Sequence, residues 1–331
     1  MGAVLGDEDA IVFPQSLSSS HPEDLIRFCQ RILETADERI TILNAEHLAF
    51  IDPLGLAAFR AVLDTVEHTH PGKEYNVQWM AEHLSSYLQR MEFFQGIEVD
   101  GLPVYQGPAL SSDPMNCVEL RQIHEDNSEV IASQLVSAIT GMAPDDETFE
   151  DADKIRRPIE YALKELLGNA LSHAKRDGRG TASVWVACQH FGNSGTVRLA
   201  IVDNGCGFLA TLKDHEKLIE RSDAGAIQTA LLERVSCNRG PFVGYETDSQ
   251  NQGVGLTTTA KIAGAAGGWL VIASGNAWFH TADQQAREMD GIRWPGVAIA
   301  FACQRADLPN VSIPALLPAV ELDAGPDLNF V

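Results

Sequence analysis

Residues 155–174 read IRRPIEYALKELLGNALSHA, and this run has a strong helical pattern. Apolar residues recur every three or four positions from Ile155 to Ala174, which is the spacing of one face of an α-helix, and that face must pack against a core. Glu165, Asn169 and His173 lie four residues apart and therefore share a second face, away from the centre of the apolar stripe. Such a polar row, taken alone, is typical of a solvated helix surface, so its neighbours in the sequence decide how it is interpreted.

Two glycine-containing motifs follow this helix in the chain. A strand pattern over residues 197–202 ends in Asp203-Asn-Gly-Cys-Gly207, where two glycines after a carboxylate permit the backbone to approach a ligand closely. Further on, Gly253-Val-Gly-Leu256 precedes a helical pattern whose first N–H groups are free to hold phosphate oxygens. Each motif is weak evidence by itself, because Asn-Gly is also a common hairpin turn.

Taken in order, the three motifs resemble the three boxes of the GHKL superfamily of ATP-binding domains, which includes gyrase, Hsp90, histidine kinases and MutL. The closest resemblance is to anti-sigma-factor serine kinases and histidine-kinase-like ATPase domains. It covers residues 154–305 and implies a Bergerat-type α/β sandwich, with a mixed sheet and helices on one face. It also implies ATP and Mg²⁺ as cofactors.

The resemblance implies a role for each motif residue. Asn169 would ligate Mg²⁺ between the phosphates, because a neutral oxygen donor suits a hard cation that keeps several waters. Asp203 would accept a hydrogen bond from the adenine amino group, and Glu165 would act as the general base toward an attacking water or hydroxyl. His173 would be either structural or close to a phosphate, and residues 238–252 would form the ATP lid. The remaining residues expected to contact the nucleotide are Gly205, Gly207, Gly253, Val254, Gly255 and Leu256.

Residues 1–106 alternate strand and helix patterns, which predicts a smaller α/β domain before the nucleotide-binding one. Arg39–Leu43 and Leu48–Phe59 resemble the sulfate-transporter-and-anti-sigma-antagonist (STAS) domain, whose usual Asp-Ser-x-Gly motif reads Asp52-Pro-Leu-Gly55 here. Pro53 replaces the serine that accepts phosphate in those domains. Proline instead suits the first turn of a helix, which Asp52 can cap. We therefore expect this STAS-like unit to be a docking or dimerisation surface and not a phosphorylation target.

Residues 107–153 combine a Pro/Ser-rich patch with an amphipathic stretch from Val118 to Ile139, which predicts a helical connector with one helix. His124 lies in this stretch and is the candidate for a histidine-kinase phosphoacceptor. A stretch of this length is too short for the two-helix hairpin that normally carries such a residue, so an exposed helical histidine is the preferred interpretation. Residues 306–331 are expected to form an irregular tail.

Composition restricts the classes of partner. The 331 residues carry a formal net charge of -22, which disfavours nucleic-acid binding. Apolar runs are too short to span a bilayer, and the first residues are acidic and unlike a secretory signal, so we expect no membrane partner and a cytoplasmic location. The six cysteines form no C-x-x-C pair, which favours reduced thiols over a zinc site.

The sequence thus predicts an α+β protein that uses Mg-ATP as a regulatory switch in signalling. Its expected chemistry is slow ATP hydrolysis or Ser/Thr phosphoryl transfer to a protein partner, and a homodimer is compatible with this interpretation. Two alternatives stay open. One is a histidine-kinase-like enzyme, and the other is a non-catalytic module in which ATP orders the lid to form a protein-binding surface.

Overall fold

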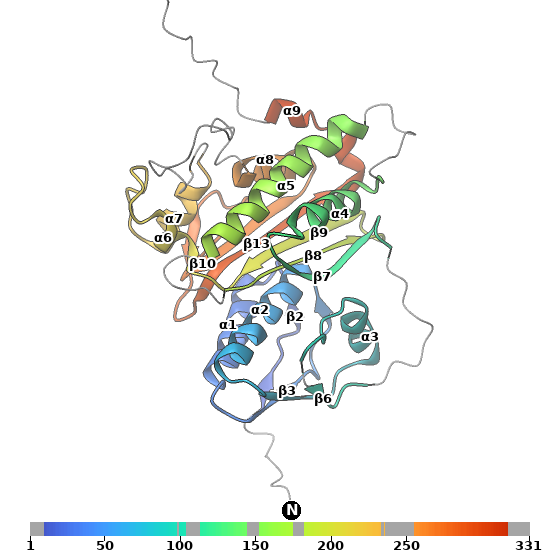
Figure 1. Cartoon of the computed structure of the whole chain (residues 1–331), viewed down its shortest axis with the longest axis vertical. Coiled ribbons are helices and arrows are strands. Elements are labelled where there is room, and N and C mark those ends of the chain that lie inside the picture. Colours follow the sequence, from blue (N-terminus) through green and yellow to red (C-terminus); the bar gives the residue numbers. More distant parts are fainter. Residues whose placement is uncertain are drawn as a thin grey trace, which may run out of the picture.

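The structure, a computed structural model, describes residues 10–97, 99–103, 113–143, 152–174, 182–232, 235 and 255–316. These residues form four layers (Figure 1): an outer layer of helices, a seven-stranded sheet, a second layer of helices and a four-stranded sheet. Among the described residues, none of the helices combines the length and the hydrophobicity needed to span a bilayer.

The N-terminal unit supplies the four-stranded sheet and the inner helices. Its elements are β1 (Ile11–Val12), β2 (Ser16–Leu17), α1 (Pro22–Glu34), β3 (Ile40–Asn44), β4 (Phe50–Ile51), α2 (Pro53–Thr69), β5 (Glu74–Gln78), α3 (Glu82–Arg90) and β6 (Val99–Asp100). The sheet is parallel, in the order β1-β3-β5-β6, and β2 pairs with β4 in a separate two-stranded sheet. The expected small α/β unit is present, and its resemblance to STAS domains stays a prediction.

The second unit supplies the seven-stranded sheet and the outer helices. Its elements are β7 (Cys117–Ile123), α4 (Ser128–Thr140), α5 (Ala152–Ala174), β8 (Val184–Phe191), β9 (Thr196–Asp203), α6 (Gly207–Leu212), α7 (Asp223–Ala230), α8 (Gly255–Ala265), β10 (Trp269–Gly275), β11 (Ala277–His280), β12 (Ala286–Glu288), β13 (Trp294–Gln304), the 3₁₀ helix η2 (Arg305–Asn310) and α9 (Ile313–Leu316). The strand order is β12-β11-β10-β13-β9-β8-β7. The helix expected from Ile155 to Ala174 is confirmed as the greater part of α5, and the strand pattern expected over residues 197–202 is confirmed within β9.

The expectation of a mixed sheet is wrong, because every pair of neighbouring strands in the seven-stranded sheet is antiparallel. β9 and β10 are joined through α6, α7 and α8, a connection typical of parallel neighbours. β13, from the end of the domain, lies between them and pairs antiparallel with both. The insertion of this last strand replaces a parallel pairing with two antiparallel ones.

The expectation of one helix from Val118 to Ile139 is wrong in its first half. Residues 117–123 form β7, which pairs antiparallel with β8 at the edge of the sheet, and only the second half is helical, as α4. His124 consequently lies in the turn between β7 and α4 and is not a helical residue. The tail is also more regular than expected, since η2 and α9 occupy residues up to 316, and the rest of it lies outside the described residues.

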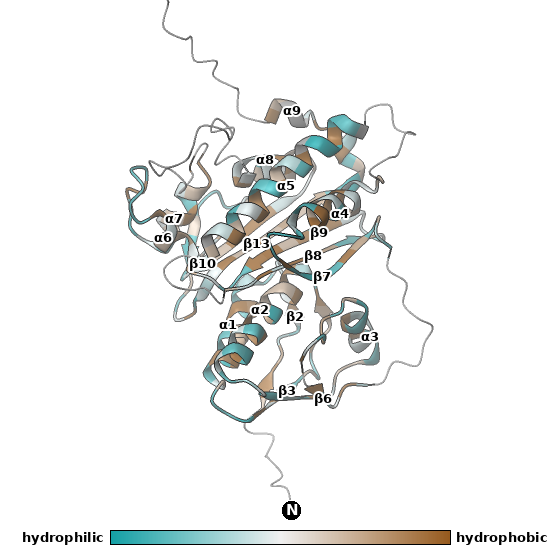
Figure 2. Cartoon of the chain, in the orientation of Figure 1, coloured by the Kyte–Doolittle hydropathy of each residue, from teal (hydrophilic) through white to brown (hydrophobic). Residues whose placement is uncertain are grey.

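The seven-stranded sheet is buried on both faces, and each face has its own composition. The outer face carries large aliphatic and aromatic residues that pack against α4, α5 and α8, and Figure 2 shows the hydrophobic residues along β9 and on α4. The inner face is rich in alanine and joins the core of the N-terminal unit. The expectation of helices on one face is therefore incomplete, since α2 covers the second face. The inner-face alanines are Ala187, Ala200, Ala273, Ala298 and Ala300.

Helix α2 lies unusually close to this inner face. Its Cα atoms come within 8 Å of Cα atoms in β8, β9 and β13. Small residues on both sides permit this approach, because α2 buries Ala57, Ala58 and Ala61 where it meets the alanines of the sheet. The N-terminal unit therefore docks on the second unit through a shared core.

Asp52 connects the start of α2 to the sheet. Its carboxylate accepts a hydrogen bond from the Gly55 N–H at 3.1 Å, so the expected N-cap followed by Pro53 is confirmed. The same carboxylate accepts from the backbone N–H of Ser19 at 3.0 Å and from Arg198 Nη1, on β9, at 3.0 Å. Because Asp52 is almost fully buried, this ion pair ties the helix cap to the neighbouring domain.

We expect Asp52→Ala to lower the free energy of unfolding by about 2–5 kcal/mol, because it removes the cap and leaves Arg198 without its buried partner. Denaturant titration followed by circular dichroism measures the change. Arg39→Ala is the matched control: it breaks the exposed pair with Glu74 and should cost about 0–1 kcal/mol. Equal effects of the two substitutions would contradict the anchoring role of Asp52.

Candidate nucleotide site

A pocket lies between the second half of α5, the end of β9 and the start of α8. It contains about 810 Å³ of empty space, counting the part open to solvent. Most of its lining is apolar. Five of the residues that the sequence motifs predicted belong to the lining: Asn169, Asp203, Gly207, Gly255 and Leu256.

Helix α5 places Asn169 in the lining, whereas Glu165, one turn earlier, is half-buried beside it and is not part of the lining. Gly255, at the start of α8, is held directly against α5: a Cβ at this position would lie 3.2 Å from the Cβ of Glu165 and 3.3 Å from the carbonyl oxygen of Ala162. The first residue of α8 and the polar face of α5 therefore meet at one edge of the pocket.

Three of the expected contacts cannot be placed. Gly253 and Val254 lie outside the described residues, as does the lid expected over residues 238–252. His173 belongs to α5, but only its backbone is described. Their assigned roles stay predictions.

Asp203 is the buried carboxylate of the pocket. It ends β9, and it accepts hydrogen bonds from the N–H of Gly205 at 2.9 Å and from the N–H of Val297. Burial raises the pKa of Asp203 to about 7, while the two N–H donors act in the opposite direction. A carboxylate with further lone pairs, set among apolar residues, is suited to accept a hydrogen bond from a ligand that enters this pocket.

The two glycines after Asp203 serve different structural purposes. Gly207 has a φ of +76°, in the left-handed region, and lines the pocket. Gly205 is not in the lining: a Cβ there would lie 2.4 Å from the carbonyl oxygen of Ala174, so this glycine lets the loop pass under the end of α5.

Residues of β10 and β13 contact the loop that follows Asp203. The sequence motifs did not indicate these residues. Trp294 Nε1 donates to the carbonyl oxygen of Asp203 at 3.0 Å, and Ser274 Oγ accepts from the N–H of Phe208 at 3.0 Å. A Cβ at Gly296 would lie 2.3 Å from the same carbonyl oxygen, so only glycine permits this approach. A glycine inside a strand is a sequence signal for close backbone contact, and it is the feature that could have identified Gly296.

Comparison with known families agrees with this geometry. Residues 154–287 match the family model described as histidine kinase-, DNA gyrase B-, and HSP90-like ATPase. The match includes α5, the Asp203 loop and the start of α8, and it supports ATP binding and an ATPase- or kinase-like regulatory function. No curated protein and no solved structure matches the chain.

The raised pKa of Asp203 predicts a specific pH dependence of stability. Asp203 ionises near its ordinary value of 3.8 in the unfolded chain and near 7 in the folded one. Between these values the folded protein keeps a proton that the unfolded chain releases, so wild-type stability falls as the pH rises, by about 4 kcal/mol in total. We therefore expect Asp203→Asn, which cannot titrate, to gain stability relative to wild type from pH 4 to pH 7 and not beyond.

Urea denaturation of both proteins in steps of pH measures this difference, and all other titrating groups cancel in the comparison. A difference that does not change between pH 4 and pH 7 would show that Asp203 is already ionised in the folded protein.

Proposed function

We propose that the protein binds Mg-ATP in the pocket of α5, β9 and α8 and uses the nucleotide as a regulatory switch. The proposed chemistry is slow hydrolysis or Ser/Thr phosphoryl transfer to a protein partner. The observation that carries the proposal is that Asn169, Asp203 and Gly255, from three separate motifs, line one pocket. The family match over residues 154–287 supports the nucleotide.

The pocket residues fit an adenine nucleotide. The Asp203 carboxylate would accept from the adenine amino group, and Ile201, Val297 and Ile299 offer apolar surface for the base. At the other edge, the first N–H groups of α8 would hold phosphate oxygens. Asn169 would ligate Mg²⁺, which neutralises phosphate charge when bound.

Glu165 is the proposed general base. It precedes Asn169 by one helical turn and lies against Gly255, so it stands at the same edge of the pocket as the expected phosphates. From there its carboxylate would accept the proton of an attacking water or Ser/Thr hydroxyl. In this proposal Asn169 would bind the ion and Glu165, one helical turn earlier, would act on the attacking group, so binding and chemistry are assigned to different residues.

The described residues support the histidine-kinase-like alternative less well than the leading proposal. His124 lies in a turn, its N–H donating to Asn127 Oδ1 at 2.8 Å, and the helix that follows packs in the outer layer beside α5. This is not the two-helix hairpin that such a phosphoacceptor needs. The non-catalytic module is separated from the leading proposal by an assay of hydrolysis and transfer with γ-labelled ATP.

We expect Asp203→Ala to weaken ATP binding by about 5- to 150-fold, because the buried amino group of adenine loses its acceptor. Isothermal titration calorimetry in the presence of Mg²⁺ measures the affinity. Glu74→Ala, on the sheet of the N-terminal unit, is the control and should bind like wild type. An unchanged ATP affinity in Asp203→Ala would contradict the assignment of this pocket as the ATP site.

We expect Glu165→Gln to leave ATP affinity close to that of wild type and to reduce turnover by about 10²–10⁴-fold, the range for loss of a general base. Calorimetry and phosphate release from γ-labelled ATP, with and without candidate partner proteins, measure the two quantities. If wild type itself neither hydrolyses ATP nor transfers phosphate, the non-catalytic module replaces the catalytic proposal.

A further inference from the structure

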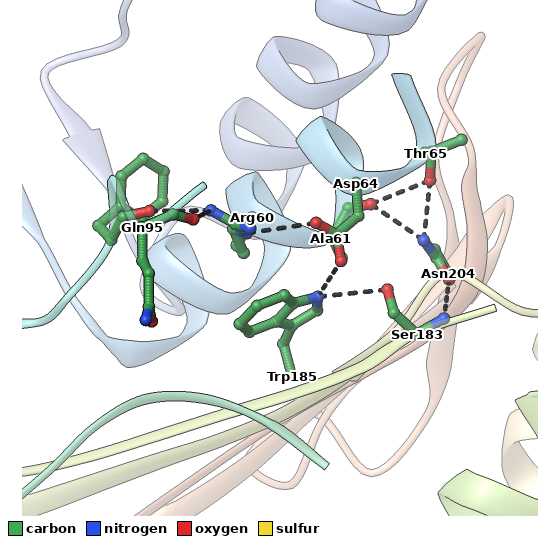
Figure 3. Close-up of polar contacts among 9 residues, drawn as sticks. Arg60, Ala61, Asp64, Thr65, Gln95, Ser183, Trp185 and Asn204 are labelled. Carbon is green, nitrogen blue, oxygen red and sulfur yellow. Dashed lines mark hydrogen bonds and ion pairs between the residues drawn. The ribbon is translucent and has the colours of Figure 1, made fainter. Parts of the chain in front are cut away.

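Asn204 belongs to the glycine motif but directs its side chain to the N-terminal unit (Figure 3). Its Nδ2 donates to the carbonyl oxygen of Ala61 at 3.0 Å and to Thr65 Oγ1 at 2.9 Å, both on α2. Its Oδ1 accepts from the N–H of Ser183 at 2.7 Å, just before β8. The side chain is thus fixed between a helix of one unit and a strand of the other.

The residue before Asn204 faces the opposite way. Asp203 lines the pocket with its carboxylate, while its carbonyl oxygen accepts from Trp294 Nε1. Trp294 is fully buried in the core that the sheet shares with α2. The backbone of Asp203 and Asn204 therefore runs between the pocket on one side and the docked N-terminal unit on the other.

Other contacts hold α2 at this place without touching the glycine motif. Asp64 accepts from Trp185 Nε1 at 2.6 Å, and the Arg60 guanidinium lies 4.7 Å from the centre of the Trp185 ring (Figure 3). Arg60 also donates to the carbonyl oxygen of Gln95 at 2.7 Å. The Gln95 contact lies within the N-terminal unit, whereas the two Trp185 contacts join the units and do not involve the Asn204 side chain. Trp185 is therefore a suitable comparison for Asn204.

We infer that Asn204 is a positioning residue, which uses α2 to hold the Asp203 carboxylate where it can accept from adenine. This inference rests on the proposed ATP site. It makes docking of the N-terminal unit and recognition of adenine mutually stabilising, because a coupling free energy between two sites acts equally in both directions. The N-terminal unit is then part of the adenine-recognition machinery and does more than cover the sheet.

The test compares two variants of this contact with one docking control. Thr65→Val keeps the shape of the side chain and removes one of the two acceptors of Asn204 Nδ2, and Asn204→Ala removes the contact altogether. Trp185→Phe removes the hydrogen bonds from Nε1 to Asp64 and to Ser183 Oγ, while the hydrogen bonds of Asn204 to Ala61, Thr65 and the Ser183 N–H are kept. Calorimetry with Mg-ATP and with inosine triphosphate, which lacks the amino group, measures adenine recognition separately from triphosphate binding.

We expect Thr65→Val to weaken ATP binding by about 2- to 10-fold and Asn204→Ala by at least as much, with little change for inosine triphosphate. Trp185→Phe should keep the wild-type preference for ATP over inosine triphosphate, even where it lowers the melting temperature. If Thr65→Val and Asn204→Ala keep the preference for ATP over inosine triphosphate while Asp203→Ala loses it, the positioning role is wrong and the assignment of the ATP site is kept. If wild type fails to bind ATP, the proposed function itself is wrong.

Hydrogen exchange tests the reverse direction of the coupling. ATP should slow amide exchange in residues 57–69 of α2 in wild type and in Trp185→Phe, and should slow it less in Thr65→Val and Asn204→Ala. ATP binding without any change in α2 exchange in wild type would overturn the coupling.

Discussion

The close packing of α2 on the inner face of the seven-stranded sheet is the constraint on which the other features depend. An antiparallel sheet commonly buries one face and leaves the other in water. Here the inner face carries alanines together with Trp185 and Trp294, which would form an exposed apolar surface without the N-terminal unit. Because the two units share one core, the N-terminal unit is a structural part of the nucleotide-binding domain.

Two polar contacts set the register of this packing. The Arg198 guanidinium on β9 meets the Asp52 carboxylate at the start of α2 and lies 5.6 Å from the centre of the Phe50 ring. Near the other end of β9, Asn204 binds the second half of α2. Helix α2 thus contacts β9 near both ends of the strand. The last residue of this strand is Asp203, whose carboxylate lies in the pocket. Movement of α2 relative to β9 would therefore change the position of Asp203.

This arrangement also gives a physical account of the Asp52-Pro53 sequence. The Asp52 carboxylate caps the helix, accepts a hydrogen bond from Ser19 and forms an ion pair with Arg198. Both Asp52 and Pro53 are buried. A phosphate at the position of Pro53 would bring further negative charge beside a buried carboxylate. The contacts that anchor α2 on the sheet therefore disfavour a phosphate at this place, and proline suits the first turn of the helix.

The sequence by itself determined the features that local rules govern. Helical periodicity defined α5, the strand pattern before Asp203 defined β9, and capping chemistry defined the start of α2 at Asp52. The motif order also indicated which residues would share a pocket. The tertiary structure alone decided that residues 117–123 form a strand, that β13 lies between β9 and β10, and that Asn204 and Gly296 meet their partners around Asp203. These outcomes depend on contacts between segments far apart in the chain, and such contacts leave no periodic or capping signal in the sequence around them.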